Sequence, residues 1–239
     1  MAQPKTSTPL RGLLVVDKPV GWSSMDVVRR VRCAAGGVKT GHAGTLDPLA
    51  TGVVVCCLGQ ATKCVERLMG LTKVYEAEVD LSAFTTTDDL EGEREQVTPG
   101  GGEQASPPAQ SDVASALERF VGLIQQKPPV FSAVHINGRR AYKLARKGET
   151  VETRPRTVRI DSIEMLAFNW PIVSLRIVCG RGTYIRSIAR DLGVQLNTGG
   201  HVAALRRTAV GPYTLDQAFN EHRLREPIGQ EDLLEMPGE

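Results

Sequence analysis

One aspartate and one histidine stand in a turn-rich stretch that could present a reactive group. Asp47 precedes Pro48, which pushes it out of helical geometry into an extended or turn conformation. His42 lies between Gly41 and Gly44, whose backbone freedom would let its ring enter or leave a pocket. The spacing does not form a Ser-His-Asp system. On residue type alone, Asp47 also fits a plain turn and His42 a loop histidine bonded to a neighbouring carbonyl.

The elements expected around this stretch would hold it beside a buried sheet. An apolar strand is predicted over residues 12–17, and Ser23 or Ser24 can cap a helix that runs through Cys33. Residues 39–52 hold three glycines, one proline and three threonines before a strand resumes over residues 53–58. A loop this long inside a compact core is usually functional.

The rest of the chain mixes strands and helices without regular alternation. Residues 91–110 are rich in Gly, Pro, Gln and Glu and are predicted to form a mobile surface loop. A hairpin turn is expected at residues 137–138, and a helix is expected to begin at Ser111 or Asp112. Further strands are predicted over residues 74–81, 157–168, 172–179 and 202–210, with a helix over residues 184–196. The pattern favours an α+β fold with a mixed, mostly antiparallel sheet.

Composition narrows the class of protein. The chain has 239 residues, of which 41% are hydrophobic, so it can bury a core. Its five cysteines include no CxxC pair, which favours buried thiols in a reducing cytoplasm. No apolar run approaches the ~20 residues of a membrane span, and no Gly-rich phosphate loop is present. We therefore expect a cytoplasmic protein that binds neither a membrane nor a nucleotide cofactor.

The net charge of the chain is small, at +2, but basic and acidic residues are concentrated in different segments. Residues 139–159 carry eight basic side chains against two acidic ones, whereas residues 216–239 carry seven acidic side chains against two arginines. Such sorting suits a protein with one face toward phosphate, although a basic segment can also be a solvated surface.

Several longer motifs resemble the TruB family of tRNA pseudouridine synthases. They occur in the family's order: Leu14-Val-Val-Asp-Lys-Pro-Val-Gly21, Gly41-His-Ala-Gly-Thr-Leu-Asp-Pro-Leu-Ala-Thr-Gly52, Lys73-Val-Tyr75, Gly182-Thr-Tyr-Ile-Arg186 and His201-Val-Ala-Ala-Leu-Arg-Arg207. The resemblance covers residues 12–213. It implies a pseudouridine synthase catalytic fold with a central active-site cleft, and isomerisation of uridine at tRNA position 55 in the T-loop, without cofactor or metal.

The resemblance also implies site residues. Asp47 matches the catalytic aspartate, and Arg186 matches the arginine that pairs with it. Whether Asp47 attacks the ribose C1′ or the uracil C6, or acts through a glycal, stays open. The base must be flipped out of its stack. Further matches are the aromatic platform and candidate proton acceptor Tyr75, the flipping histidine His42, and the pocket positions Lys18, Tyr184 and Leu205.

Three of these matches carry qualifications. A solvated lysine would also explain Lys18, and a core leucine would explain Leu205. Tyr184 would face the same site as Arg186 only where the segment is extended, so residues 182–186 are expected at a strand end or at the start of a helix.

The basic segment resembles the part of the family that lies along the tRNA T-arm. Its phosphate-contacting residues are predicted to be Arg139, Arg140, Lys143, Arg146 and Lys147. The expected organisation is a disordered tail over residues 1–11, a catalytic domain over residues 12–215 with an RNA-binding insertion at 128–159, and a short acidic tail over residues 216–239. We expect a monomer in a short form of the family without an obvious carboxyl-terminal RNA-binding domain.

Two alternatives share these motifs. One is a tRNA-folding chaperone, in which binding of tRNA is the main function. The other is the catalytic subunit of a guide-RNA particle, which normally carries an additional carboxyl-terminal domain.

Overall fold

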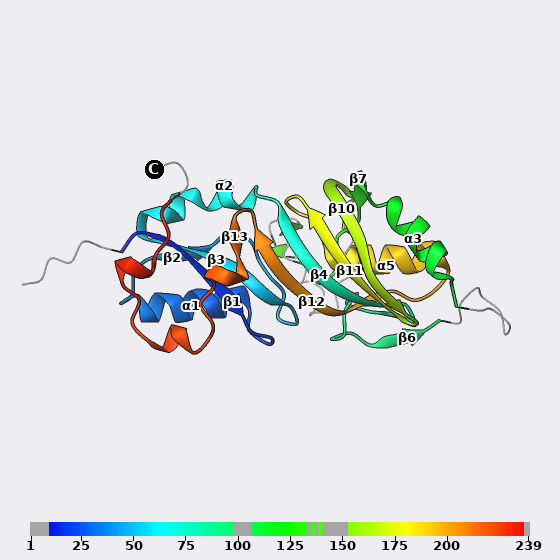
Figure 1. Ribbon diagram of the computed structural model, residues 1–239, viewed down its shortest axis with the longest axis horizontal. Helices are drawn as coiled ribbons and strands as arrows, with labels where there is room; N and C mark the ends of the chain where they lie inside the picture. The colour runs from blue at the N-terminus through cyan, green and yellow to red at the C-terminus, as the bar shows by residue number, and fades with distance from the viewer. Residues whose placement is uncertain (1–9, 98–106, 133–134, 137–138, 141–152, 237–239) are drawn as a thin grey trace, which may run out of the picture. The chain divides into compact units, whose positions relative to one another are not determined.

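A computed structural model describes residues 10–97, 107–132, 135–136, 139–140 and 153–236 (Figure 1). The chain divides into two compact units. The first comprises Met1–Leu71 with Arg206–Glu239, and the second comprises Thr72–Leu205. Strand β12 (His201–Val210) contributes its first half to the second unit and its second half to the first.

The sheet of the first unit is built on β1 (Gly12–Lys18) and β3 (Thr51–Leu58), which pair antiparallel along their whole length. Strand β2 (Thr40–His42) pairs antiparallel with β3, and β12 pairs with β3 in parallel. The short strand β13 (Tyr213–Thr214) extends β12 as a hairpin. This arrangement places Lys18, Gly52 and Arg207 side by side on three neighbouring strands.

Both faces of this sheet are covered. Helix α1 (Ser24–Ala34) packs on β1, β2 and β3 and buries Val27, Val28 and Val31. Leu13, Val15, Val53, Val55 and Cys57 belong to a second apolar cluster, to which α2 (Val65–Met69) adds Leu68 and the 3₁₀ turn η1 (Gly59–Cys64) adds Ala61. Because β1 and β3 are apolar on both faces, their sequences read as continuous hydrophobic runs.

The second unit has a sheet in which β4, β11, β10 and β7 pair antiparallel, with helices on one face (Figure 1). Its strands follow the order β12, β4 (Lys73–Asp80), β11 (Ile172–Cys179), β10 (Arg156–Asn169) and β7 (Gly122–Gln126). Helices α3 (Gln110–Glu118) and α5 (Ile185–Leu196) contact each other, α3 also contacts β10, and α5 contacts β4. Two small hairpins complete the unit: β5 (Ala83–Thr85) with β6 (Arg94–Gln96), and β8 (His135–Ile136) with β9 (Arg139–Arg140).

Most predicted elements are confirmed to within a residue or two, but three local predictions are wrong. The interval 91–110, expected to be a loop, contains β6, because Arg94–Gln96 pairs with β5. The interval 39–52, also expected to be a loop, contains β2. Of the five thiols expected to be buried, Cys56, Cys57 and Cys179 are, whereas Cys64 is half-buried and Cys33 is exposed.

The acidic segment after residue 215 folds onto the first unit as far as the structure describes it. It forms the 3₁₀ turns η3 (Leu215–Gln217), η4 (Arg223–Arg225) and η5 (Gln230–Asp232). Its main chain bonds β1 at two places: Leu234 exchanges hydrogen bonds with Leu13, and Phe219 bonds both Val15 and Asp17. These residues therefore extend the sheet edge rather than trail away from it.

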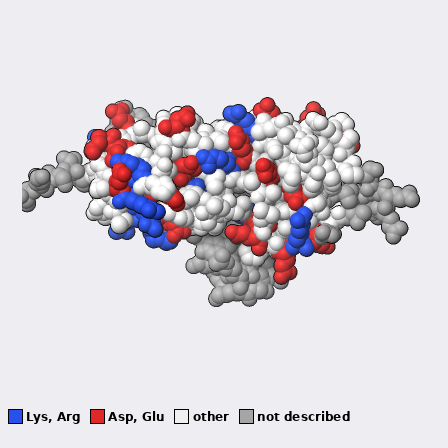
Figure 2. Space-filling view, turned by 60° about the horizontal axis from the view of Figure 1, so that its bottom comes forward, with Lys and Arg blue, Asp and Glu red and all other residues white. Residues whose placement is uncertain are grey.

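The surface around α1 is densely charged. Arg29, Arg30 and Arg32 are all exposed on this helix. Basic and acidic side chains crowd together at the left of Figure 2, on the side where α1 lies in Figure 1. No helix among the described residues is both long and apolar enough to cross a membrane.

Candidate active site

Asp47 lies in a loop that is fixed through its main chain on both sides. Ser24 accepts a hydrogen bond from the Leu46 N–H at 2.8 Å, and its hydroxyl lies 3.1 Å from the Leu46 carbonyl. On the other side, the Gly21 N–H donates to the Pro48 carbonyl at 2.8 Å. The Asp47 side chain is half-buried. Local order on both sides of a partly accessible carboxylate is the preorganisation that catalysis requires.

Lys18 is a buried cation beside this loop. Its side chain is 0% exposed, and its Nζ donates to the carbonyls of Pro19 at 2.9 Å, Trp22 at 2.8 Å and Pro48 at 3.3 Å. Burial lowers the pKa of Lys18 to about 8, against the attraction of the Asp47 carboxylate, which raises it. Three donated bonds use all three ammonium protons, so Lys18 is charged at neutral pH. The alternative of a solvated lysine is wrong.

Arg207 is a second buried cation under the same loop, and sequence reasoning gave it no role. Its guanidinium donates to the carbonyls of Val53 at 2.7 Å, Gly44 at 3.2 Å and Thr45 at 3.3 Å. The side chain is 1% exposed. Its positive charge also lowers the pKa of Lys18. Two buried cations therefore hold the loop and set a positive potential around the Asp47 carboxylate.

Gly52 allows β3 and β12 to approach closely at this point. Its φ of +104° is a backbone conformation that residues with a side chain rarely adopt, and a Cβ there would lie 2.1 Å from the Arg207 carbonyl oxygen.

We expect Gly52→Ala to lower the free energy of unfolding by roughly 3 kcal/mol or more, because backbone strain and the clash with Arg207 add to each other. Urea denaturation measures this.

Gly37→Ala is the matched control, since Gly37 also has a positive φ of +87° but a Cβ there would meet nothing within 4 Å. The control should cost only about 1 kcal/mol. Equal losses in the two variants would show that the close approach of Arg207 contributes nothing.

His42 ends β2, where it pairs with Cys56 of β3, and its ring is half-buried. The prediction that it takes part in base flipping is untested. His42 and Asp47 both belong to the first unit.

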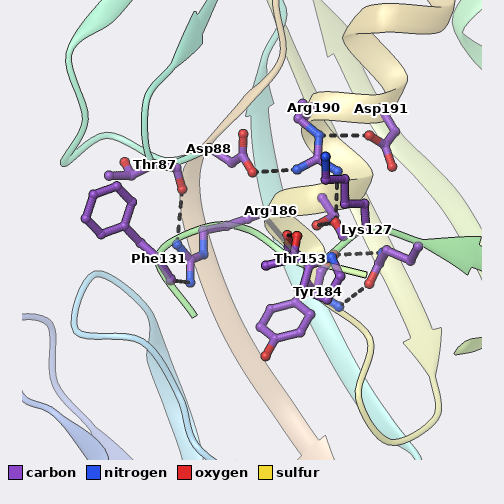
Figure 3. Close-up of polar contacts among 12 residues, drawn as sticks. Thr87, Asp88, Lys127, Phe131, Thr153, Tyr184, Arg186, Arg190 and Asp191 are labelled. Carbon is purple, nitrogen blue, oxygen red and sulfur yellow. Dashed lines mark hydrogen bonds and ion pairs between the residues drawn. The ribbon is translucent and has the colours of Figure 1, made fainter. Parts of the chain in front are cut away.

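In the second unit, Arg186 is the second residue of α5 and is buried. Its guanidinium donates to the carbonyls of Thr87 at 3.1 Å and Phe131 at 3.0 Å (Figure 3). It also forms an ion pair with Asp89 at 3.2 Å. Sequence reasoning missed Asp89. The predicted pairing of Arg186 with Asp47 joins residues of separate units and stays a prediction.

A second ion pair reinforces the turn that carries Asp89. Asp88 has a φ of +61°, and its carboxylate binds Arg190 at 2.9 Å (Figure 3). Arg190 also bonds the Lys127 carbonyl at 3.0 Å. Burial raises the pKa of Asp88, although Arg190 opposes the shift. The turn and α5 are thus joined by two charge pairs one helical turn apart, which restricts Arg186.

The remaining predicted pocket residues of this unit occupy ordered positions. Tyr184 is the N-cap of α5 with extended backbone, φ −106° and ψ 114°, which confirms the expected start of a helix. Its backbone N–H and C=O both bond the Gln126 side chain, and the Arg156 guanidinium stacks 4.8 Å from its ring. Tyr75 on β4 and Leu205 on β12 are both 8% exposed.

The predicted phosphate contacts fall mostly beyond the described residues. Lys143, Arg146 and Lys147 lie outside them. Arg139 and Arg140 form β9, which pairs with β8 around the predicted hairpin turn; residues 137–138 of that turn also lie outside the described residues. Among the described residues, no group of three or more His, Cys, Asp or Glu is arranged to hold a metal ion.

Comparison with solved structures defines the fold. The chain aligns with a chain of a Cbf5-Nop10-Gar1 complex with a TM-score of 0.69 and 27% identity, covering 93% of this chain and 59% of that one. A chain of an H/ACA RNP bound to a substrate RNA containing 2'-deoxyuridine aligns with a TM-score of 0.65 and 26% identity, covering 88% and 51%. This chain therefore spans between half and three-fifths of the solved chains. The α+β fold expected from the sequence is confirmed as the pseudouridine synthase fold.

Comparison with known sequences defines the family. Residues 30–185 match the TruB family pseudouridylate synthase N-terminal domain, and residues 186–235 match the tRNA pseudouridylate synthase B C-terminal domain. The tRNA pseudouridine synthase B of Phocaeicola vulgatus is 45% identical over 95% of this chain and 97% of its own. That of Thermobifida fusca is 47% identical over 87% and 72%. The chain belongs to the TruB family of pseudouridylate synthases, an isomerase family, and the resemblance read from its motifs is confirmed.

Proposed function

We propose that this chain isomerises uridine to pseudouridine at position 55 in the T-loop of tRNA, with Asp47 as its catalytic carboxylate. The observation that carries the proposal is the loop around Asp47, held by Lys18, Ser24 and Arg207, within a chain that matches a tRNA pseudouridine synthase B over 97% of that relative's length. A tRNA substrate would place the reaction in the cytoplasm.

In the proposed reaction, every bond broken and every bond formed belongs to the substrate uridine. The bond between N1 of uracil and C1′ of ribose breaks, a bond between C5 and C1′ forms, C5 loses its proton and N1 gains one. No electron carrier is needed, because nothing is oxidised or reduced overall. The target base must first leave its stack, at a cost of a few kcal/mol. Asp47 would then act on C1′, on C6 or through a glycal, and Tyr75 would serve as the platform and proton acceptor.

The remaining residues would serve binding and orientation. Arg186 would keep the carboxylate ionised and aimed, as a guanidinium does in a charge-assisted pair. Lys18 holds the Pro48 carbonyl and would fix the loop from below. Tyr184 and Leu205 would line the pocket, and His42 would take part in the flip.

The direct experiment is incubation of the protein with unmodified tRNA transcripts, followed by mapping of pseudouridine by chemical probing. We expect one modified position, in the T-loop. A transcript with cytidine at position 55 is the control and should stay unmodified. If no transcript gains pseudouridine, the chain is not a synthase, and RNA binding alone would be its function.

A separate prediction concerns the basic segment, whose arginines and lysines we propose to be phosphate contacts. Replacing Arg139 and Arg140 together by Gln should weaken binding to every tRNA alike, because phosphates carry no sequence information. The slope of log K against log salt should fall by roughly 1.5 to 2 units, as expected for two lost contacts. Binding titrations at several salt concentrations measure it.

Two results would contradict this assignment. An unchanged salt slope would show that the pair does not touch phosphate, and affinity lost for only one tRNA sequence would indicate reading of bases. Either would move the backbone-tracking surface elsewhere.

A further inference from the structure

Two adjoining hollows on the first unit form a groove beside α1. One, of about 400 Å³, is lined by Gly21, Trp22, Asp26, Arg29 and Arg30. The other, of about 310 Å³, is lined by Trp22, Arg30, Glu221, Leu224 and Arg225. Trp22 and Arg30 line both, so the two hollows adjoin each other. We call them together the α1 groove.

The groove combines an aromatic ring with cations that are available to a ligand. The Arg30 guanidinium lies 5.5 Å from the centre of the Trp22 ring. Within the part of the chain that the structure describes, neither Arg30 nor Arg225 has a carboxylate partner. Both side chains are exposed.

The lining of the groove carries a small positive charge. Asp26 accepts bonds from the Ser23 backbone and hydroxyl and forms an ion pair with Arg29. Glu221 lies 3.7 Å from the His222 ring, which balances its charge only when that ring is protonated. The three lining arginines, Arg29, Arg30 and Arg225, thus outnumber the two carboxylates by one.

The groove begins at the loop that carries Asp47. Gly21, which lines it, donates its N–H to the Pro48 carbonyl, and Lys18 bonds the carbonyls of both Trp22 and Pro48. All these residues belong to one unit. The main chain at Trp22 is therefore bound by the same lysine as the loop that carries Asp47, which places the groove beside that loop.

We propose that the α1 groove binds single-stranded substrate RNA next to the target uridine, with one unpaired base stacked on Trp22 and phosphates bound by Arg30 and Arg225. The inference rests on the proposed function. Unpaired bases stack on aromatic rings and on guanidinium planes, and a guanidinium also binds phosphate oxygens in pairs. A ring, two available arginines and an adjacent catalytic loop match that chemistry.

The first experiment compares two charge reversals on the same helix. Arg30→Glu should weaken binding of unmodified tRNA about tenfold and reduce the salt slope by about 1 unit, because a phosphate contact is lost. Arg32→Glu is the matched control: Arg32 is also exposed on α1, but it bonds the Gly37 carbonyl and does not line the groove. Arg32→Glu should bind tRNA like the wild type.

The second experiment observes the ring directly. The chain has two tryptophans, Trp22 and Trp170, so Trp170→Phe leaves Trp22 as the only indole emitter. Saturating unmodified tRNA should quench this fluorescence, and Trp22→Ala should weaken binding about fivefold or more whereas Trp22→Phe retains most of it. Inorganic phosphate should not quench it, because phosphate has no base to stack.

The outcomes separate the two proposals. If the wild type forms pseudouridine but Arg30→Glu binds tRNA as Arg32→Glu does, or Trp22 fluorescence is unchanged by tRNA, the α1 groove is not an RNA site. If the wild type forms no pseudouridine on any transcript, the proposed function is wrong.

Discussion

Asp47→Asn should abolish pseudouridine formation while tRNA affinity stays within about threefold of the wild type. The amide keeps the size of the side chain but loses its negative charge and its nucleophilicity. Since the loop is held through the carbonyls of Gly44, Thr45 and Pro48, the substitution leaves the supports of the loop in place. Single-turnover assays with excess enzyme separate chemistry from binding.

Asp216→Asn supplies a control with the same change of atoms at an exposed position of the same unit. It should retain wild-type activity. Pseudouridine formation above a few per cent in Asp47→Asn would mean that another group performs the chemistry.

Arg186→Ala should lower turnover by more than about a hundredfold, the loss that follows removal of one preorganised charged donor from an active site. The variant should also be less stable, by roughly 3 to 5 kcal/mol, because the buried Asp89 carboxylate loses its cation. Activity and urea denaturation should both be measured, because loss of activity alone could follow from unfolding.

The double variant Arg186→Ala with Asp89→Asn distinguishes the two effects. Neutralising Asp89 removes the unpaired buried charge, so much of the stability should return while turnover stays low. Recovery of activity together with stability would show that Arg186 serves the fold of the unit rather than the reaction.

Local patterning accounts for what the sequence predicts well. The apolar runs of β1 and β3 and the capped, amphipathic α1 are each recognisable within a short stretch of chain. Strand β6 could not be foreseen, because Arg94–Gln96 is polar and becomes a strand only by pairing with β5. The segment after residue 215 was expected to be an acidic tail for a similar reason. It attaches to β1 through backbone hydrogen bonds, which cannot be recognised from side-chain composition.

The residues of the candidate site also differ in how far the sequence predicts them. Asp47, His42 and Lys18 stand in motifs that a reader can match to a family. Arg207 also ends a matched motif, but its role was not apparent because an arginine in a strand usually faces water. Asp89 stands in no matched motif and meets Arg186 only because the fold brings together residues 97 positions apart. Long-range ion pairs and buried cations are products of tertiary structure, and one sequence does not encode their partners visibly.

The way in which the Asp47 loop is anchored has a consequence for its tolerance of substitution. Lys18 and Arg207 hold it entirely through main-chain oxygens, which every amino acid carries. Randomising the side chains of Thr45 and Leu49 should therefore yield many working enzymes, whereas the two anchoring cations, which lie far away in the sequence, should accept few replacements. Mutational robustness is thus distributed unevenly: the exposed side chain of Thr45 and the half-buried one of Leu49, close to Asp47 in the sequence, are more open to redesign than the distant cations.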